Sequence, residues 1–206
     1  METSTRSYDE EYESTMRSIH ESRMKKAGLF GEYARADSDE GHTVYERAKA
    51  GNGSYLYGPC GTGKTYAAAC AIRLALKDGA QAKLITTKAY LDLIKAKYNG
   101  EESPSEKLVS SVPLLALDDI GMERLTPWAM EELSGLVDVR SSMGLPTIFT
   151  SNFKLGEIRD RWGGIEGARV VSRIAGACEV IEMCGADRRL EKRVARASVL
   201  GTSQAT

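Results

Sequence analysis

The sequence predicts a three-layer α/β fold in which helices cover both faces of a central parallel sheet. From residue 41 onward, short apolar runs alternate with helical segments, as expected for strands joined by right-handed helical crossovers. Residues 112–120 form an apolar run that contains two aspartates near its end, which is typical of a strand buried on both faces. A glycine-rich loop follows an earlier apolar run, residues 55–57. Together these observations favour one domain with its ligand site at the carboxyl ends of the strands.

The composition is that of a globular protein with little net charge. The 206 residues carry 28 Lys and Arg against 29 Asp and Glu, a net charge of −1. The chain therefore lacks the global basic field of most DNA-binding domains, and any contact with nucleic acid needs a local patch. No apolar run approaches the roughly 20 residues of a membrane span. The polar N-terminus has no signal-like apolar region, so we expect a cytoplasmic protein with no membrane partner.

Cysteines and histidines give no pattern typical of a metal site. Four cysteines occur without a C-x-x-C pair, which argues against zinc and against a disulfide framework. We expect all four to be small buried residues in a reducing compartment: Cys60, Cys70, Cys178 and Cys184. His20 and His42 stand alone in charged segments and are expected on the surface.

Three parts are expected along the chain. Residues 1–40 form an acidic, polar arm, helical or partly disordered, in which a helix from Tyr8 to Lys26 carries Met16, Ile19 and Met24 on a thin apolar stripe. Residues 41–185 form the α/β domain, and residues 186–206 a basic tail. The expected strands are Ser54–Tyr57, Lys83–Thr87, the run at 112–120, Pro146–Ser151 and Val180–Cys184. The expected helices are Val44–Ala50, Tyr66 to about Lys77, Ala89–Tyr98, a turn or two at Glu106–Ser111, Pro127 to near Gly144, Leu155–Trp162 and Gly164–Ala177.

The loop from Gly58 to Thr65 fits the pattern G-x-x-x-x-G-K-[ST] of a P-loop. Its glycines let the backbone fold tightly, so that successive N–H groups point at a phosphate chain. Lys64 would reach the β- and γ-phosphates, and the Thr65 hydroxyl would ligate Mg²⁺. The alternative is a chance glycine-rich turn. The expected cofactors are ATP and Mg²⁺, and the expected ATP contacts are Gly58, Pro59, Cys60, Gly61, Thr62, Gly63, Lys64, Thr65 and Tyr66.

Polar side chains follow two later strands. Asp118 and Asp119 close the run Leu114–Leu117; Asp118 would hold Mg²⁺ through its water shell, and Asp119 could orient the attacking water. Asn152 ends the next strand, where an amide can hold the lytic water or the γ-phosphate. The alternatives are acids and an amide that only cap turns.

Arg169 and Arg173 are four residues apart and so share one helix face. Two alternatives follow. Both arginines are solvated surface charges, or one of them is an arginine finger that reaches the γ-phosphate of the nucleotide on a neighbouring subunit.

The ordered set GPCGTGKT, LLALDDIG, a TPW helix, PTIFTSN and ARVVSRI resembles the AAA+ ATPases of the DnaC/DnaI helicase-loader and IstB transposition-helper group. The resemblance implies a P-loop NTPase (AAA+/ASCE) with strand order 5-1-4-3-2 and no C-terminal helical lid. It implies Lys64 and Thr65 as Walker A, Asp118 and Asp119 as Walker B, and Asn152 as sensor 1. Arg173 is then the trans-acting finger, with Arg169 the second choice. Arg189 best matches sensor 2, and Arg188 remains open.

The helix after the second expected strand carries cations interleaved with aromatic residues. This composition can grip a nucleic-acid backbone and stack bases, so single-stranded DNA is an expected partner through Lys88, Tyr90, Lys95, Lys97 and Tyr98. The alternative is an ordinary amphipathic helix whose Tyr90, Leu91 and Ile94 pack inward.

Four functions stay open on this sequence. The first is a helicase loader or primosome component that self-assembles through its finger, uses ATP, and acts with a replicative helicase on single-stranded DNA. The second is an IstB-type ATPase that assists a transposase. The third is a P-loop kinase for a small molecule. The fourth is a nucleotide-dependent interaction protein that scarcely hydrolyses ATP, because residue 119 is Asp where many AAA+ proteins have Glu.

Overall fold

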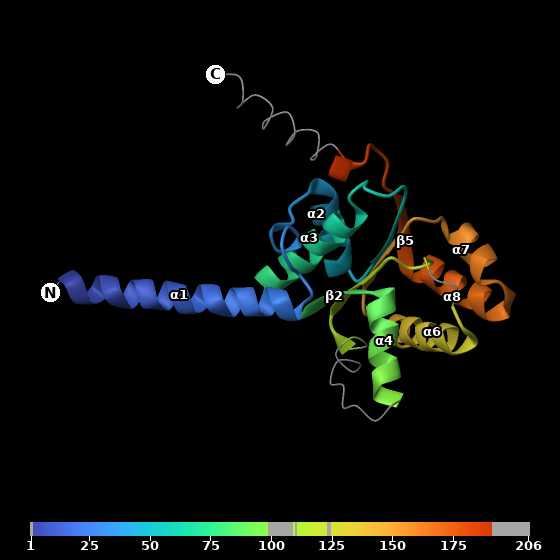
Figure 1. The fold of residues 1–206 in the computed structure, drawn as a ribbon, viewed down its shortest axis with the longest axis horizontal. Helices are drawn as coiled ribbons and strands as arrows, with labels where there is room; N and C mark the ends of the chain where they lie inside the picture. Colours follow the sequence, from blue (N-terminus) through green and yellow to red (C-terminus); the bar gives the residue numbers. More distant parts are fainter. Residues whose placement is uncertain (1, 99–108, 110, 123–124, 191–206) are drawn as a thin grey trace, which may run out of the picture.

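Five parallel strands form one sheet in the order β2-β3-β4-β1-β5, of which the two edge strands, β2 and β5, are labelled in Figure 1. The computed structural model describes residues 2–98, 109, 111–122 and 125–190. The strands are β1 (Gly53–Tyr57), β2 (Ala82–Thr86), β3 (Leu114–Asp118), β4 (Thr147–Ser151) and β5 (Cys178–Glu182). Every pairing is parallel. This is the expected order read from the opposite edge, so the predicted fold is confirmed.

Helices cover both faces of the sheet, which gives three layers (Figure 1). One face carries α2 (Asp39–Lys49) and α3 (Lys64–Lys77), and the other carries α4 (Thr87–Tyr98), α6 (Pro127–Ser142) and α8 (Gly164–Ala177), with α7 (Leu155–Trp162) against α8. The register aligns Leu56, Ala116 and Ile148 toward α3, where they join the first hydrophobic cluster. Their neighbours Tyr55, Leu117 and Phe149 point to the opposite face and join the second, because successive strand side chains alternate.

Helix starts follow local capping chemistry. Thr126 caps α6: its hydroxyl accepts a 3.2 Å hydrogen bond from the Ala129 N–H, and Pro127 occupies the first turn as expected. Ser38 does the same for α2 by accepting from Gly41 N–H at 3.1 Å. Helix α2 therefore begins at Asp39, five residues before the predicted start, since Ser38 and not the apolar Val44 sets its N-terminus.

The last strand begins two residues earlier than predicted. β5 spans Cys178–Glu182 instead of Val180–Cys184, with Cys178 opposite Gly53 of β1. Glu179 and Val180 are exposed because β5 lies at the edge of the sheet, so hydrophobicity does not mark where the strand starts. Among the described residues beyond β5, which end at 190, there is no helical lid domain.

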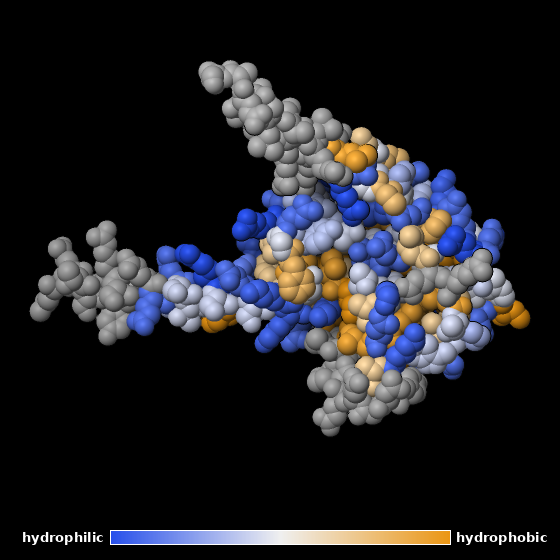
Figure 2. Space-filling view, in the orientation of Figure 1, coloured by the Kyte–Doolittle hydropathy of each residue, from blue (hydrophilic) through white to orange (hydrophobic). Residues whose placement is uncertain are grey.

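The N-terminal helix α1 (Glu2–Lys26) projects from the body of the fold, and its surface is mostly hydrophilic (Figures 1 and 2). Of the expected stripe, Met24 is buried, whereas Met16 and Ile19 are 47% and 49% exposed. The chain after α1 packs into the domain: Leu29 and Ala36 are buried in the cluster around α3, and a short 3-10 helix, η1, spans Tyr33–Arg35. Residues 24–38 are thus part of the packed body of the fold.

The cysteines differ from expectation. Cys70 is buried and Cys178 is half-buried, but Cys60 and Cys184 are exposed, so only part of the set packs as small hydrophobic residues; all four are free thiols. His20 and His42 are exposed, as predicted. Most of the expected helical turn at 106–111 and most of the basic tail lie outside the described residues. No helix in the described part has the length and apolar character needed to cross a bilayer.

Candidate functional site

A cavity of about 900 Å³ opens at the carboxyl ends of the central strands, beside the loop that joins β1 to α3. It brings together predicted residues from four separate stretches of the chain. These are Cys60, Gly61, Gly63, Lys64, Thr65 and Tyr66 from the loop and helix, Asp118 and Asp119 at the end of β3, Asn152 after β4, and Arg189 after β5. Gly58, Pro59 and Thr62 belong to the same loop but do not line the cavity.

Two loop glycines are required by their backbone conformation and by their neighbours. Gly58 and Gly61 have φ values of 148° and 80°, which side chains rarely adopt. A Cβ on Gly58 would lie 2.2 Å from the carbonyl oxygen of Met183, and one on Gly61 would lie 2.0 Å from Oδ1 of Asp187. The segment after β5 therefore packs directly on the loop, and any larger residue at either glycine would displace it.

Lys64 is held inside the loop by backbone carbonyls. Its Nζ donates to the oxygens of Gly58 at 2.8 Å and Pro59 at 2.7 Å. Burial lowers the pKa of this ammonium. The Lys64 ammonium is therefore already positioned to pair with an anion that enters the cavity. That anion would replace the carbonyl oxygens of Gly58 and Pro59 as the partner of Lys64.

Asp118 receives two hydroxyl hydrogen bonds on the same oxygen. Thr65 Oγ1 donates to Oδ1 of Asp118 at 2.9 Å, and Thr150 Oγ1 donates to it at 2.5 Å. Burial raises the pKa of Asp118 despite these bonds. A hydroxyl and a carboxylate in contact offer the hard oxygen ligands that Mg²⁺ prefers, so this pair fits the ion.

Asp119 has an unusual backbone. Its φ of 58° makes it the one non-glycine residue with positive φ in the described part of the chain. Two interactions with β4 stabilise this turn: the Asp119 N–H donates to Thr150 Oγ1 at 3.0 Å, and the Ile120 N–H donates to the Thr150 carbonyl at 2.9 Å. Strained residues of this kind cluster at functional sites, and here the strain places Asp119 on the cavity wall beside Asp118.

Thr150 is the functional residue that sequence reasoning missed. It is fully buried in β4, yet its hydroxyl joins the carboxylate of Asp118 to the backbone of Asp119. The available signal was a polar residue inside an apolar strand, two positions before Asn152. Asn152 itself lines the cavity, and its Nδ2 lies 3.3 Å from the sulfur of Met122.

The two candidate sensor arginines both line the cavity. Arg188 is the more constrained of the two: its backbone N–H donates to the Gly61 carbonyl at 3.0 Å, and its guanidinium pairs with Glu40 at 3.0 Å. Glu32 and Tyr33 also line this cavity, although sequence reasoning assigned them to the arm. They are brought there by the packing of residues 24–38, which no local pattern indicates.

The two candidate finger arginines do not line the cavity of their own subunit. Arg173 is half-buried on α8, where it forms an ion pair with Asp138 and lies 3.4 Å from the hydroxyl of Ser134, both on α6. Arg169 is exposed and pairs with Glu166 at 3.3 Å. Neither arginine can therefore act on a ligand in its own cavity without leaving its partner.

The expected DNA-binding group on α4 is divided by the fold. Tyr90 is only 4% exposed and packs with Leu91 and Ile94 in the second cluster, so the structure corrects its proposed role in base stacking. Tyr90, Leu91 and Ile94 lie on one face of α4 because of their helical spacing, and that face points inward. Lys88 and Lys95 remain on the surface, where Lys88 pairs with Asp92 at 2.6 Å. Lys95 lies 5.5 Å from the ring centre of Trp128. The side chains of Lys97 and Tyr98 lie outside the described part.

Comparisons with known proteins find relatives of this chain in sequence and in fold. The replicative helicase loader DnaI of Bacillus subtilis is 32% identical over 155 residues, which cover 70% of this chain and 50% of DnaI. The ATP-binding protein of an IS21-like insertion sequence from Bacteroides fragilis is 31% identical over 146 residues, 67% of this chain and 53% of that protein. A crystal structure of DnaI superposes with a TM-score of 0.65 at 26% identity, covering 76% of this chain and 92% of that one.

The chain spans about half the length of these two curated relatives. The family described as IstB-like ATP binding protein matches residues 48–196, which include the P-loop, Asp118 and Asp119, Asn152 and both candidate sensor arginines. The chain belongs to the IstB-like ATP binding protein family.

Proposed function

We propose that this protein binds and hydrolyses ATP with Mg²⁺ and uses that cycle to act on a DNA-processing assembly. The observation that carries the proposal is the contact between Thr65 and Asp118 at 2.9 Å, at the floor of a cavity that also presents Lys64. A P-loop threonine beside a strand-end carboxylate is the arrangement by which such enzymes hold a nucleotide-bound metal.

Each cavity residue has a distinct proposed role. Lys64 pairs with the phosphates, while Thr65 and Asp118 hold Mg²⁺; when bound, this ion neutralises charge on the β- and γ-phosphates. Asp119 orients the attacking water, and its left-handed backbone keeps the carboxylate at the strand tip. Asn152 faces the same space from β4 and contacts the water or the γ-phosphate.

The finger acts between subunits in this proposal. Arg173 is docked on α6 of its own subunit and does not line its own cavity, which supports a role at the cavity of a neighbour. Self-assembly would then be required for full activity, and a lone subunit would hydrolyse slowly. A cis-acting small-molecule kinase has no such requirement.

The partner we propose is a replicative helicase, with single-stranded DNA held nearby. The support is the similarity to a replicative helicase loader over 70% of this chain. A second candidate function, assistance to a transposase, is supported by the family match and by the similarity to an insertion-sequence ATP-binding protein.

Two experiments test these proposals in turn. Lys64→Ala removes the phosphate-binding ammonium, so a fluorescent ATP analogue should bind the wild type and not the variant. Equal binding by both would reject the nucleotide site. A pull-down with the host replicative helicase, with and without ATP, tests the loader. Retention of the helicase supports it, whereas ATP-dependent retention of a transposase in a parallel pull-down supports the second function.

A further inference from the structure

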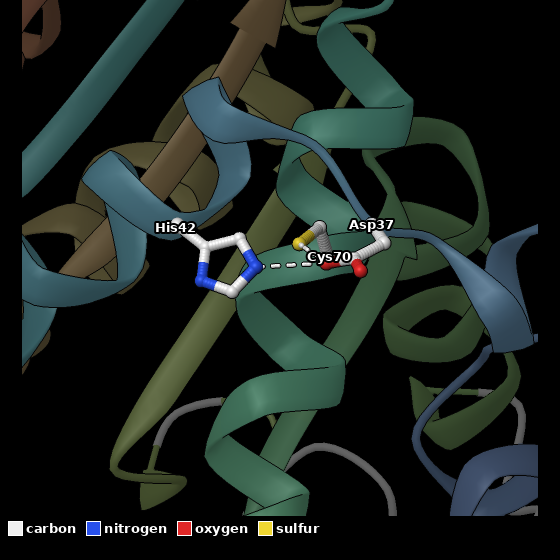
Figure 3. Close-up of side chains that lie close together, drawn as sticks. All are labelled: Asp37, His42 and Cys70. Atoms are coloured by element: carbon white, nitrogen blue, oxygen red, sulfur yellow. Dashed lines mark hydrogen bonds and ion pairs between the residues drawn. The ribbon is translucent and has the colours of Figure 1, made fainter.

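Asp37, His42 and Cys70 form a cluster of three side chains of the types that ligate metals (Figure 3), and none of them lines the nucleotide cavity. They come from the segment before α2, from α2 and from α3, and their ligand atoms all lie within 4.8 Å of one another. We propose that this cluster binds one Zn²⁺ ion, with these three residues as ligands and water in the fourth position.

The ligand set fits zinc by chemistry. A thiol, an imidazole and a carboxylate are the three donors that Zn²⁺ uses in proteins, and three such ligands with one open position is a common arrangement. Mg²⁺ and Ca²⁺ prefer oxygen alone, so sulfur at Cys70 and nitrogen at His42 select against them. The site would therefore be independent of the magnesium ligands proposed at Thr65 and Asp118.

The ligand distances also fit a single ion. Tetrahedral zinc, with bonds of about 2.0–2.3 Å, separates its ligand atoms by roughly 3.5 Å. Cys70 Sγ lies 3.9 Å from Asp37 Oδ1, close to that value, and His42 Nε2 lies 2.7 Å from the same oxygen, in a hydrogen bond. Inserting the ion needs the His42–Asp37 pair to open by somewhat less than 1 Å, and the three ligand atoms already lie within 4.8 Å of one another. The side chains of His42 and Asp37 are both more than half exposed, which leaves space for that movement.

The packing of α2 on α3 builds the site. A Cβ on Gly41 would lie 2.4 Å from the Cβ of Cys70, so only glycine allows the helices to come this close. The next residue, His42, is thereby placed beside the thiol. From the other side, Arg73 donates to the Ala36 carbonyl at 2.6 Å and to Asp37 Oδ1 at 3.1 Å, which orients the carboxylate. Burial raises the pKa of the Cys70 thiol, and the positive charge of Arg73 offsets part of that rise.

A bound ion would fasten the segment before α2 to the P-loop helix. Tyr66, one turn before Cys70 on α3, already accepts a 3.2 Å hydrogen bond from the Asp37 N–H and lines the nucleotide cavity. Zinc at the cluster would add a second link at the same place, so metal binding should raise the melting temperature of the nucleotide-free chain.

The test uses the full chain, first stripped with a chelator, and Zn²⁺ alone as the probe. Competition against a chromogenic chelator should give one zinc per chain, and His42→Ala should weaken binding by about 10–100-fold or more. His42 is exposed, so this variant should fold. His20→Ala is the matched control, with unchanged affinity. Absence of zinc binding by the wild type, or equal affinity in His42→Ala, would overturn the proposal.

Cobalt provides a second readout that reports the thiolate directly. Co²⁺ in place of zinc should give a sulfur-to-metal charge-transfer band that disappears in Cys70→Ser and persists in Cys178→Ser. Asp118→Asn should retain both the band and the zinc stoichiometry, since it lies at the other site. A band that survives Cys70→Ser would overturn the assignment of the sulfur ligand.

Discussion

The hydroxyl of Thr150 lies 2.5 Å from Oδ1 of Asp118, so a side chain near the end of β4 fixes the carboxylate at the end of β3. The same hydroxyl accepts the N–H of Asp119 at 3.0 Å. One side chain thus positions both acids of the proposed catalytic pair, although Thr150 does not line the cavity. It is a positioning residue, and its loss should affect the two acids together.

Thr150→Val keeps the shape of the side chain and removes both hydrogen bonds. We expect a loss of about 1–3 kcal/mol in the free energy of unfolding, because the buried Asp118 carboxylate and the partly buried Asp119 N–H each lose a hydrogen-bond partner. The turnover rate should fall more than ATP affinity, since the P-loop is untouched. Thr150→Ser restores the hydroxyl and should recover turnover. Equal turnover in wild type and Thr150→Val would contradict the positioning role.

Asp118→Asn should stabilise the metal-free protein at neutral pH. Burial raises the pKa of Asp118 in the folded state, so folding favours its protonated form. Below the unfolded pKa of about 3.9 the carboxyl is neutral in both states and the substitution changes little. As pH rises toward the folded pKa, the wild type loses stability that the variant keeps.

Melting curves of both proteins between about pH 4 and pH 7.5 measure this difference, which should grow with pH. Mg²⁺ with ATP should oppose it by stabilising the wild type more than the variant, which lacks one proposed Mg²⁺ ligand. A variant that is less stable than the wild type at every pH would show that the hydroxyl bonds to Asp118 outweigh its burial.

Asp119→Asn should leave Mg²⁺ and ATP bound while slowing hydrolysis. The change spares Asp118 and Thr65 and removes only the negative charge that we assign to the attacking water. We expect turnover to fall by about 10²-fold or more. Equilibrium binding of a fluorescent ATP analogue and steady-state phosphate release separate the two effects. Loss of nucleotide binding with this variant would mean that the roles of the two acids are reversed.

The sequence was sufficient to predict residues that belong to short motifs. Asp118 and Asn152 stand at the ends of β3 and β4, and Lys64 begins the helix that follows β1; the topology of a parallel sheet brings these strand ends together. Glu32 and Tyr33 could not be predicted, because they reach the cavity through tertiary packing of the segment after α1. Tyr90 shows a different limit of pattern reasoning: an aromatic at helical spacing reads equally as a base-stacking or a core residue, and burial decides for the core.

Because Tyr90 is buried, the predicted binding of single-stranded DNA by α4 depends on its lysines. Lys95 is exposed on α4, and Lys97 follows on the same helix. Reversing both charges, Lys95→Glu with Lys97→Glu, should weaken binding of labelled single-stranded DNA and lower the dependence of log affinity on log salt by about 1.4, or 0.7 for each lost phosphate contact. Fluorescence anisotropy measures both. Lys49→Glu on α2 is the control, and an unchanged affinity in the double variant would exclude this surface.

Substitution of Arg173 tests whether ATP hydrolysis requires assembly of subunits. If the finger works between subunits, specific ATPase activity should rise with protein concentration, or with a partner or DNA that promotes assembly. Arg173→Ala should still bind ATP but lose the assembly-dependent increment, by on the order of 10³-fold or more. Arg169→Ala, on the same face of α8 but exposed and paired with Glu166, is the matched control and should keep that increment. The reverse result would make Arg169 the finger.

Mixing two inactive variants separates a trans-acting finger from a cis-acting one. Lys64→Ala subunits lack the phosphate-binding ammonium but keep the finger, whereas Arg173→Ala subunits keep the cavity and lack the finger. Each alone should be nearly inactive. In mixed assemblies, an intact cavity meets an intact Arg173 from the neighbouring subunit, released from Asp138 on its own α6. Activity should therefore recover in part. Activity that is independent of concentration, with no recovery on mixing, would instead indicate an enzyme that completes its site within one chain.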